Sequence, residues 1–589
     1  IVQAFGTQKM AKENAIIKKL KAVESLGCVS VICSDKTGTL TQNKMTVQQV
    51  YVDGKVIDGK ELDLTDQTQR YLLYDAVLTN DSSIVDGKGI GDPTEYALLE
   101  MFRKIQVLPD SYFGKMGMHE DALRKVMDRI EEVPFDSDRK LMSTKYRIHG
   151  VPTILTKGAV DVLLDRCVSV RYGDGIRPMT EEEKEKIRLQ NQHFSENGLR
   201  VLAFAYKESN EMLCAQAECG YVFLGLISMV DPPRPESVRA VAEAKQAGIK
   251  TVMITGDHKV TATAIAKQIG IFEEGDLALT GMELDAMSEE ELDQKIDKIS
   301  VYARVSPENK IRIVEGWQRR GNIVSMTGDG VNDAPALKKA DIGVAMGITG
   351  TEVSKDAAAM ILADDNFATI IKAVANGRNV YRNIKNAVLY LLSGNTAAIF
   401  AVLYTSLMAL PVPFAPVQLL FINLLTDSLP ALAIGMEPAD EGLLKEKPRD
   451  PKEGLMTKDF MIQMAAQGVL IAAVVITAFY LGLRSSTAMA STMAFSTLTL
   501  ARLFHGFNCR GKKSIFKLGF GTNPYSLYAF GAGALLLGLV IFIPGLHRLF
   551  QVQSMPVVSL LQVAVLAFIP TLMIQMKRLI CKNDVQKQL

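Results

Sequence analysis

Three aspartates, Asp35, Asp257 and Asp329, each follow a short apolar stretch of the chain and are suited to phosphate chemistry. The stretches occupy residues 29–33, 251–254 and 322–326. A carboxylate can attack a phosphoryl group in line and form an aspartyl phosphate, a standard covalent intermediate. If the stretches are buried parallel strands, their carboxyl ends meet at one edge of a sheet. We therefore expect the three aspartates to converge on one crevice.

A metal ion is expected beside the attacking carboxylate. Phosphoryl transfer depends on neutralising charge, so Mg²⁺ and cationic side chains must surround the phosphate. Asp35, Asp329 and Asp333 offer the oxygen ligands that Mg²⁺ prefers. A single aspartate at a strand end commonly caps a helix. Several such residues with these flanking sequences favour a magnesium site instead.

The elements that must position these residues are those of an α/β protein. Helical patterns lie at residues 235–247 and 260–268, between or after the apolar stretches. The chain between the first stretch and Pro232 has mixed character, which predicts an inserted second domain.

The C-terminal part of the chain contains long apolar segments. Asp427 is the only charged residue from Asn386 to Met436. A helix that spans a bilayer needs about 20 mostly apolar residues. A proline-rich turn at 411–416 divides the first segment, and a weaker segment surrounds Arg502. We therefore expect a membrane domain of six helices, at residues 386–410, 416–436, 460–483, 487–507, 524–544 and 556–576.

Cationic residues mark alternate ends of these expected helices. They gather at residues 378–385, 445–452, 510–517 and 577–582, whereas the other loops hold little beyond Arg484 and Arg548. Because cationic loops stay cytoplasmic, both ends of the membrane domain are expected on the cytoplasmic side. The soluble portion that precedes it is then cytoplasmic as well.

Polar side chains occur inside the second expected span. Asn423, Thr426 and Asp427 are spaced i, i+3 and i+4, so they share one face of a helix. A carboxylate inside a membrane is costly unless it is paired, which makes Asp427 a functional candidate. Pro430 favours local unwinding, which would free carbonyl oxygens for a cation. Hydrogen bonding between helices is an alternative role for Asn423.

Residues 35–41, Asp-Lys-Thr-Gly-Thr-Leu-Thr, resemble the phosphorylation motif of the P-type ATPases. Thr-Gly-Asp at 255–257 and Thr-Gly-Asp-Gly-Val-Asn-Asp at 327–333 resemble the other two active-site signatures of that family. The resemblance is strongest to the calcium-pumping branch of bacteria and sarcoplasmic reticulum. It implies a haloacid-dehalogenase-like phosphorylation domain in which Asp35 is phosphorylated, the Thr37 carbonyl binds Mg²⁺ and Lys310 contacts phosphate. The implied catalytic residues are Asp35, Lys36, Thr37, Thr255, Gly256, Asp257, Lys310 and Asn332.

Thr37 separates this chain from the haloacid dehalogenase phosphatases. Those enzymes share the sheet and the nucleophile, but carry a second aspartate two residues after the first as general acid and base. A threonine cannot do this work. The phosphoenzyme should therefore persist long enough to drive a conformational step, which argues against a phosphatase.

The inserted domain is expected to bind ATP, because the chain contains no Gly-x-x-x-x-Gly-Lys-Ser/Thr loop. By resemblance, adenine stacks on Phe135. The other nucleotide contacts implied by the resemblance are Glu95, Lys140, Lys157 and Arg200.

The resemblance also implies that Asn395, Asn423, Thr426 and Asp427 are ligands of transported Ca²⁺. Pumps with two calcium sites have carboxylates where this chain has Ala398 and Arg502. A guanidinium keeps its proton in a protein, so Arg502 would exclude a cation and pair with Asp427 in the empty site. Ala398 and Arg502 together predict that one Ca²⁺ is transported per cycle. An interfacial arginine that reaches the headgroups is the alternative.

The resemblance covers essentially the whole chain and divides it into five parts. They are the end of a fourth transmembrane helix with the stalk (1–17), the phosphorylation domain (18–45 and 222–376), the nucleotide-binding domain (46–221) and the membrane domain (377–589). The family's actuator domain and first spans would precede residue 1. The chain thus resembles the C-terminal two-thirds of a pump.

The expected function is ATP-driven Ca²⁺ transport across a membrane, expected to be a bacterial plasma membrane, with Mg²⁺ and ATP as cofactors. The alternatives are a pump for Mn²⁺, Na⁺ or H⁺, an aspartyl phosphatase, and a non-catalytic membrane scaffold, which the intact motifs disfavour. The 66 basic and 65 acidic residues among 589 leave no global basic field, which argues against nucleic-acid binding.

Overall fold

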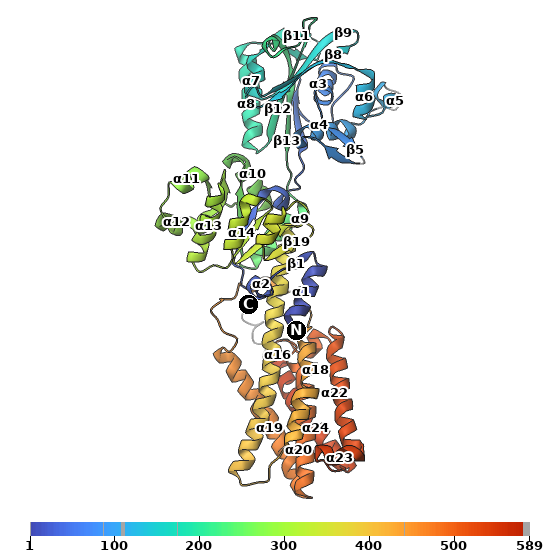
Figure 1. Ribbon diagram of the computed structural model, residues 1–589, viewed down its shortest axis with the longest axis vertical. Helices are drawn as coiled ribbons and strands as arrows, with labels where there is room; N and C mark the ends of the chain where they lie inside the picture. Colours follow the sequence, from blue (N-terminus) through green and yellow to red (C-terminus); the bar gives the residue numbers. More distant parts are fainter. Residues whose placement is uncertain (1, 86, 108–111, 174, 441, 581–589) are drawn as a thin grey trace.

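The computed structural model describes residues 2–85, 87–107, 112–173, 175–440 and 442–580. The molecule is elongated, with two sheet domains stacked above a bundle of helices (Figure 1). The expected combination of α/β domains with an all-helical membrane portion is confirmed at this level.

The sheet domain next to the bundle contains eight strands in the order β1-β19-β18-β17-β2-β14-β16-β15. Its strands are parallel except at the edge, where β1 runs antiparallel to β19. The strands are β1 Ala15–Ile17, β2 Val31–Asp35, β14 Lys250–Thr255, β15 Leu277–Thr280, β16 Ile299–Ala303, β17 Val324–Gly328, β18 Ile342–Met346 and β19 Met360–Leu362. The three strands expected from the sequence are confirmed and are neighbours, with β2 between β14 and β17.

Helices cover both faces of this parallel sheet, because side chains of a strand alternate between its faces. On β2, Val31 and Cys33 belong to one buried core and Ile32 to the other. The helices packed in this domain are α2 Lys21–Leu26, α9 Pro235–Gln246, α10 Lys259–Ile269, α11 Gly281–Asp285, α12 Glu289–Lys295, α13 Pro307–Arg319, α14 Ala334–Lys339 and α15 Glu352–Ala357.

The outer domain contains a nine-stranded sheet of order β11-β10-β13-β12-β9-β8-β7, with β3 beside β13 and β4 beside β3. The strands are β3 Thr46–Val52, β4 Lys55–Asp58, β7 Arg129–Asp136, β8 Leu141–Ile148, β9 Val151–Gly158, β10 Cys167–Tyr172, β11 Gly175–Pro178, β12 Arg200–Glu208 and β13 Tyr221–Val230. The expected domain division after residue 221 does not follow this sheet. Strand β13 pairs with β3 and β12, so the chain returns to the parallel sheet only after Val230.

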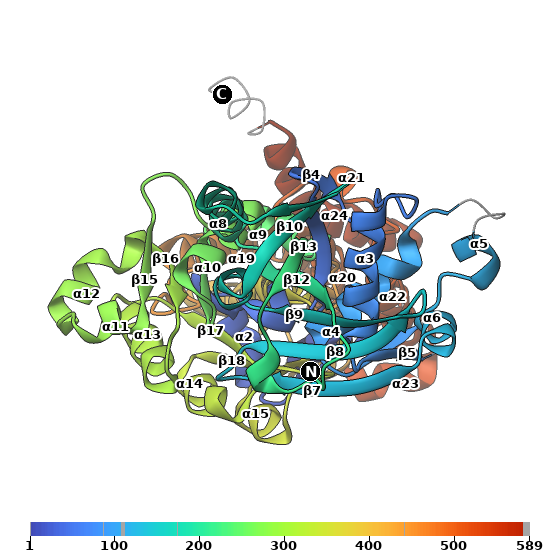
Figure 2. The same ribbon diagram turned by 90° about the horizontal axis from the view of Figure 1, so that it is seen from above.

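Two helical layers enclose the outer sheet. On β12, Phe204 and Tyr206 face one core while Ala203 and Ala205 face the other. The first core is covered by α3 Gln67–Leu78, α4 Pro93–Lys104 and α6 Glu120–Val126, and the second by α7 Val160–Asp165 and α8 Glu181–Glu196. Figures 1 and 2 show α3 and α8 on opposite sides of the strands.

The bundle contains a helix at each of the six expected positions. They are α16 Phe367–Leu407, the broken helix Pro416–Gly435 (α17 Pro416–Phe421, η5 Ile422–Thr426, α18 Ser428–Gly435), α19 Lys458–Leu483, α20 Thr487–Asn508, α22 Pro524–Phe542 and α24 Val557–Ile580. Among the described residues, five of these are long and apolar enough to cross a membrane, and α20 is the exception. Helix α20 packs against α19, α22 and α24 and is rich in buried hydroxyls. Thr492, Ser496 and Thr499 satisfy their hydroxyls on backbone carbonyls of the preceding turn.

Helix α16 joins the parallel-sheet domain to the bundle. Its 41 residues begin at Phe367, so the expected start of a membrane helix at residue 386 lies inside one continuous helix. Phe367, Ile370 and Val374 belong to a buried core of the parallel-sheet domain. Helices α1 Val2–Lys12 and α2 pack beside α16.

A close contact at Gly377 lets α2 approach α16. A Cβ at this position would lie 2.8 Å from the Leu26 Cβ and 2.9 Å from the Val23 carbonyl oxygen. We expect Gly377→Ala to lower the free energy of unfolding by about 1–3 kcal/mol, the usual cost of overpacking. Thermal unfolding of the full-length protein measures this. The control Gly531→Ala, in α22, adds a methyl group where no atom lies within 4 Å, and an equal loss there would contradict the assignment.

Candidate functional site

Asp35 ends the central strand β2, and the chain turns sharply behind it. Its backbone amide donates to the Thr327 hydroxyl at 2.8 Å, which joins the ends of β2 and β17. Gly38 has a φ of +76°, a conformation that favours glycine, and it lets the chain leave the sheet directly after the carboxylate. The Asp35 side chain is held by Lys310, whose Nζ lies 3.0 Å from its Oδ2.

Three carboxylates meet at this edge of the sheet. Candidate ligand oxygens of Asp35, Asp329 and Asp333 all lie within 4.8 Å of one another. Lys310 also contacts Asp333 Oδ1 at 2.6 Å, and the other Asp333 oxygen accepts the amides of Asp329 and Gly330 at 3.1 and 3.0 Å. This convergent set of hard oxygen donors suits Mg²⁺, which binds through one or two carboxylates and keeps several waters.

The local charges perturb the titration of these groups. Burial raises the pKa of Asp35 above its ordinary value, and the Asp333 carboxylate adds to that rise against the opposing charge of Lys310. The pKa of Asp329 is raised by burial and by the charges of Asp35 and Asp333. Burial alone would lower the pKa of Lys310, but Asp35 and Asp333 raise it overall. The crowded carboxylates thus favour a bound cation.

The other expected catalytic residues surround this cluster. Lys36 is buried and pairs with Asp257 at 2.7 Å, so the loops after β2 and β14 are joined. The buried Thr255 hydroxyl accepts the Asp257 amide at 3.1 Å. Thr37 and Asn332 are exposed at the rim. Gly256 follows β14, and no atom within 4 Å would meet a Cβ there.

Two residues that the sequence analysis did not single out join the sheet domains. Asp231 follows β13 and accepts hydrogen bonds from the Thr41 hydroxyl and the Lys44 amide. Arg234 donates to the carbonyls of Gly38 and Thr41, both at 3.0 Å. The two chain crossings between the domains are therefore tied to the loop that follows Asp35. The sequence signal was the Asp-Pro-Pro-Arg run at 231–234 directly after an apolar stretch.

The expected nucleotide residues gather around the outer sheet. Phe135 lies near the end of β7 with 62% of its surface exposed. Lys157 on β9 is buried and pairs with Glu95 of α4 at 2.7 Å. Lys140, in the turn between β7 and β8, and Arg200, at the start of β12, are exposed. Among the described residues, no cation–π contact joins either of them to Phe135.

Asp75 is a further buried carboxylate in this domain. It lies on α3 and is fully buried, and burial raises its pKa to about 7 against the opposing influence of Thr79 and Lys157. Burial lowers the pKa of Lys157, while the Glu95 and Asp75 charges oppose that shift. The helical pattern of residues 67–78 does not identify Asp75, because its electrostatic environment depends on Lys157, which lies on the distant strand β9.

The membrane bundle contains a buried ion pair between Asp427 and Arg502. Both residues are almost fully buried, at 1% and 2% exposed, and the Arg502 guanidinium contacts Asp427 Oδ2. The same guanidinium donates to Asn395 Oδ1 at 3.3 Å, and the Tyr390 hydroxyl donates to Asp427 Oδ1 at 3.3 Å. The expected pairing of Arg502 with Asp427 is therefore confirmed, and the headgroup alternative is wrong for this structure.

The backbone around Asp427 is shaped for this pair. A Cβ on Gly394 would lie 2.3 Å from Arg502 Nε, so only glycine leaves room for the guanidinium. Residues Ile422–Thr426 form a π-helical turn, and the Asp427 amide donates to the Ile422 carbonyl at 2.9 Å. Such turns are frequent at functional sites. The turn ends four residues before Pro430, and its Ile422 carbonyl accepts hydrogen bonds instead of being free for a cation.

The expected calcium ligands are not all brought together. The Thr426 hydroxyl is buried and donates to the Ile422 carbonyl at 3.0 Å. Asn423 is exposed in the described residues, whereas Asp427 is buried. The structure thus joins Asn395 and Asp427 through Arg502 but leaves Asn423 apart.

Comparisons with known proteins identify relatives of both the sheet domains and the helical bundle. Residues 68–236 match the family described as P-type ATPase, cytoplasmic domain N, and residues 411–580 match the family described as cation transporting ATPase, C-terminus. The chain is 49% identical over 94% of its length to a calcium-transporting ATPase of Listeria monocytogenes, and covers 62% of that protein. It is 44% identical over 99% of its length to calcium-transporting ATPase 1 of Bacillus cereus, covering 67% of it.

A human relative, calcium-transporting ATPase type 2C member 1, is 35% identical over 95% of the chain, which covers 61% of that protein. The chain therefore spans less than two thirds of the length of several of these relatives. The identity extends through both sheet domains and the bundle. The chain belongs to the P-type ATPase family.

Proposed function

We propose that this chain is the catalytic and cation-binding portion of a pump that transports Ca²⁺ across a membrane at the expense of ATP. The observation that carries the proposal is a buried intramembrane carboxylate, Asp427, on a bundle joined by α16 to the domain of Asp35. The relatives whose names state calcium transport support the same ion. A phosphatase has no use for a buried ion pair in a membrane bundle.

Asp35 is the proposed nucleophile. Its carboxylate forms a bond to the γ-phosphorus while the bond to the bridging oxygen of ADP breaks, so ADP departs and an aspartyl phosphate remains. Lys310, between Asp35 and Asp333, neutralises charge on the transferred group. Mg²⁺ bound by Asp35, Asp329, Asp333 and the Thr37 carbonyl would supply further charge neutralisation.

Other residues position the nucleophile and protect the aspartyl phosphate from hydrolysis. Lys36, paired with Asp257, fixes the loop that carries the nucleophile, and Thr255, Gly256 and Asn332 border the same edge of the sheet. Thr37 offers no carboxylate to activate water, so the aspartyl phosphate persists until the pump changes conformation.

ATP binds to the outer domain in this proposal. The exposed ring of Phe135 offers a face for adenine, and Lys157 with Glu95 fixes the floor of the site. Lys140 and Arg200 contribute positive charge from the rim. The Asp231 and Arg234 contacts couple this domain to the loop behind Asp35.

Ca²⁺ binds at Asp427, with Asn395, Asn423 and Thr426 as further ligands, and one ion moves per cycle. Arg502 occupies the space beside Asp427 when Ca²⁺ is absent, so a buried anion is never left unpaired. Ala398 offers no second carboxylate. Asn423 is exposed in the described residues and therefore accessible to an ion.

The membrane domain crosses the bilayer six times, and α20, the fourth helix in chain order, is one of the spans. Its hydroxyl-rich surface faces α19, α22 and α24 instead of lipid, which explains its lower hydropathy. The cationic loops support a cytoplasmic location of both sheet domains, and the bacterial relatives favour a plasma membrane. The full-length pump would also contain the actuator domain and first spans of the family.

The nucleophile is tested by Asp35→Asn in the full-length protein. We expect acid-stable, hydroxylamine-sensitive labelling by γ-labelled ATP to disappear, because an amide cannot attack phosphorus at this site. The control Asp356→Asn removes a carboxylate that is 86% exposed on α15 and should label normally. Undiminished labelling of Asp35→Asn would overturn the assignment.

The nucleotide site is tested by Phe135→Ala. Loss of the stacking surface should weaken ATP binding by about 1–3 kcal/mol, measured by nucleotide titration. Ile130→Ala, on the same strand and 46% exposed, serves as the control and should leave binding unchanged. The assignment is wrong if both variants bind ATP like the parent protein.

The counter-charge role is tested by Arg502→Gln and by equilibrium calcium binding. The parent pump should bind one Ca²⁺. The variant should lose about 3–5 kcal/mol of stability without Ca²⁺, because it leaves a buried carboxylate unpaired, and should be stabilised by Ca²⁺ more than the parent. Arg484→Gln, exposed at the end of α19, is the control. Two bound Ca²⁺ per parent pump would contradict the proposal.

A further inference from the structure

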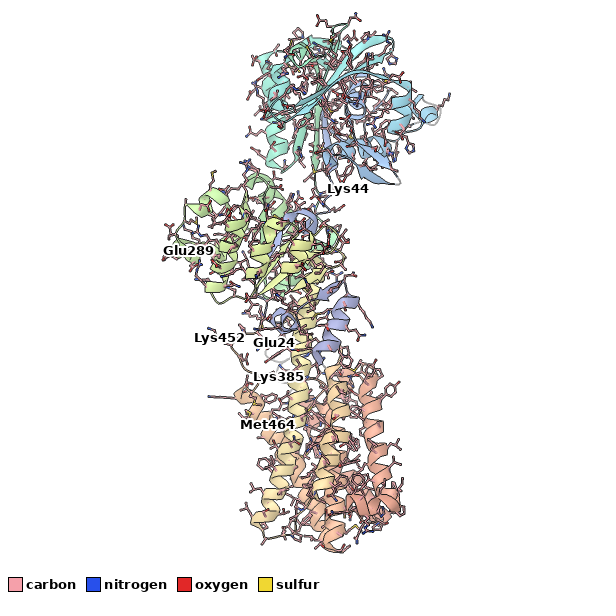
Figure 3. All side chains as sticks on the ribbon, viewed as in Figure 1. Glu24, Lys44, Glu289, Lys385, Lys452 and Met464 are labelled. Atoms are coloured by element: carbon pink, nitrogen blue, oxygen red, sulfur yellow. The ribbon has the colours of Figure 1, made fainter. Side chains whose placement is uncertain are left out.

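A cavity of about 890 Å³ lies where the bundle meets the parallel-sheet domain. Its walls come from the cytoplasmic half of α16, the loop before α19, the loop between α20 and α22, and the last turn of α24. Figure 3 shows Lys385, one of the lining residues, at the junction between the domain and the bundle. Segments far apart in the sequence therefore build one pocket at the expected cytoplasmic surface of the membrane.

The lining of this cavity is strongly cationic. Ten lining residues are basic and four are acidic. The basic residues are Arg378, Arg382, Lys385, Lys447, Arg449, Arg510, Lys512, Lys513, Lys517 and Arg578, and the acidic residues are Glu24, Glu437, Asp440 and Glu446. Positive charge on cytoplasmic loops is ordinary in membrane proteins, but that rule does not require charges from four segments to face one pocket.

Few of these cations are neutralised inside the cavity. Glu437 pairs with Arg510 at 2.9 Å, Asp440 pairs with Lys513 at 2.6 Å, and Glu24 pairs with Arg449 at 3.8 Å. In the described part of the chain, no carboxylate pairs with Arg382, Lys385, Lys512 or Lys517. The cavity therefore retains excess positive charge that an anion would neutralise.

Arg378 adds fixed positive charge to this pocket. It is only 7% exposed, and its terminal nitrogens donate to the carbonyls of Leu443, Glu446 and Ala247. These hydrogen bonds hold the guanidinium in place, so its charge acts on the cavity without a change of rotamer.

Apolar side chains accompany the cations. Leu389, Phe460 and Leu518 also line the cavity, and Lys385 Nζ lies 5.9 Å from the centre of the Phe460 ring. On and beside the short helix α21 Ile515–Leu518, Phe516 is 70% exposed and Phe520 is 49% exposed. Exposed aromatic rings next to lysines are typical of a chain segment at a membrane surface.

We propose that this cavity binds the phosphate headgroup of an anionic phospholipid of the cytoplasmic leaflet. The phosphate lies among Arg382, Lys385 and Lys517, and the acyl chains leave along Phe460 and Leu518 towards the bilayer. A free phosphate ion shares the headgroup's charge but uses none of the apolar surface, so the geometry favours the lipid. The proposal does not depend on which ion the pump transports.

Native mass spectrometry of the full-length protein tests this site. The protein is released from micelles that contain phosphatidylglycerol and phosphatidylcholine, and bound lipids are counted. We expect preferential retention of phosphatidylglycerol. Lys385→Gln and Lys517→Gln should each weaken it about fivefold, and the double variant about 25-fold, following the contribution of one surface cation. Lys452→Gln is the matched control, because this exposed lysine belongs to the same cytoplasmic region but does not line the cavity.

Three results would overturn the proposal. Equal retention of phosphatidylcholine would show that the headgroup charge is not recognised. An equal loss in Lys452→Gln would show diffuse attraction to the membrane surface instead of a site. Binding of inorganic phosphate without lipid, lost in the double variant, would assign the cavity to a free anion. Loss confined to the two cavity lysines supports the lipid site.

Discussion

A carboxylate removed from water must be neutralised, and this requirement shapes both candidate sites of the molecule. At the sheet edge, Asp35, Asp329 and Asp333 crowd together against Lys310. In the bundle, Asp427 is buried against Arg502. Each arrangement is stable only while a cation is present, because breaking a buried pair costs several kcal/mol. A bound metal ion can therefore replace or supplement a protein cation at these places.

Helix α16 gives the two sites a common support. At 1.5 Å per residue its 41 residues extend about 60 Å, from a core of the parallel-sheet domain into the bundle. Tyr390, Gly394 and Asn395 on this helix contact or accommodate the Asp427–Arg502 pair. Its first turns pack in the domain that carries Asp35. Because no loop interrupts α16, a displacement of this helix would move residues at both sites.

Short apolar stretches of the sequence were enough to predict the strands that end at Asp35 and near Asp329, because a buried strand and the polar residue at its end lie within a few consecutive positions. The pairing of Asp427 with Arg502 also followed, since an intramembrane charge needs a partner. Other features depend on contacts between distant segments. The place of β13 in the outer sheet, the room that Gly394 leaves for a guanidinium, and the meeting of cationic loops in one cavity are set by packing. The exposure of Asn423 likewise could not be read from helical spacing.

In the proposed pump, cation binding at Asp427 controls phosphorylation of Asp35 through the continuous helix α16. The most direct test compares calcium dependence of the acid-stable phosphoenzyme in the full-length protein and its Asp427→Asn variant. We expect the variant to bind ATP with unchanged affinity and to form no calcium-dependent phosphoenzyme, because a neutral amide binds Ca²⁺ weakly in place of a carboxylate. Calcium-dependent labelling that equals that of the parent protein would contradict the account.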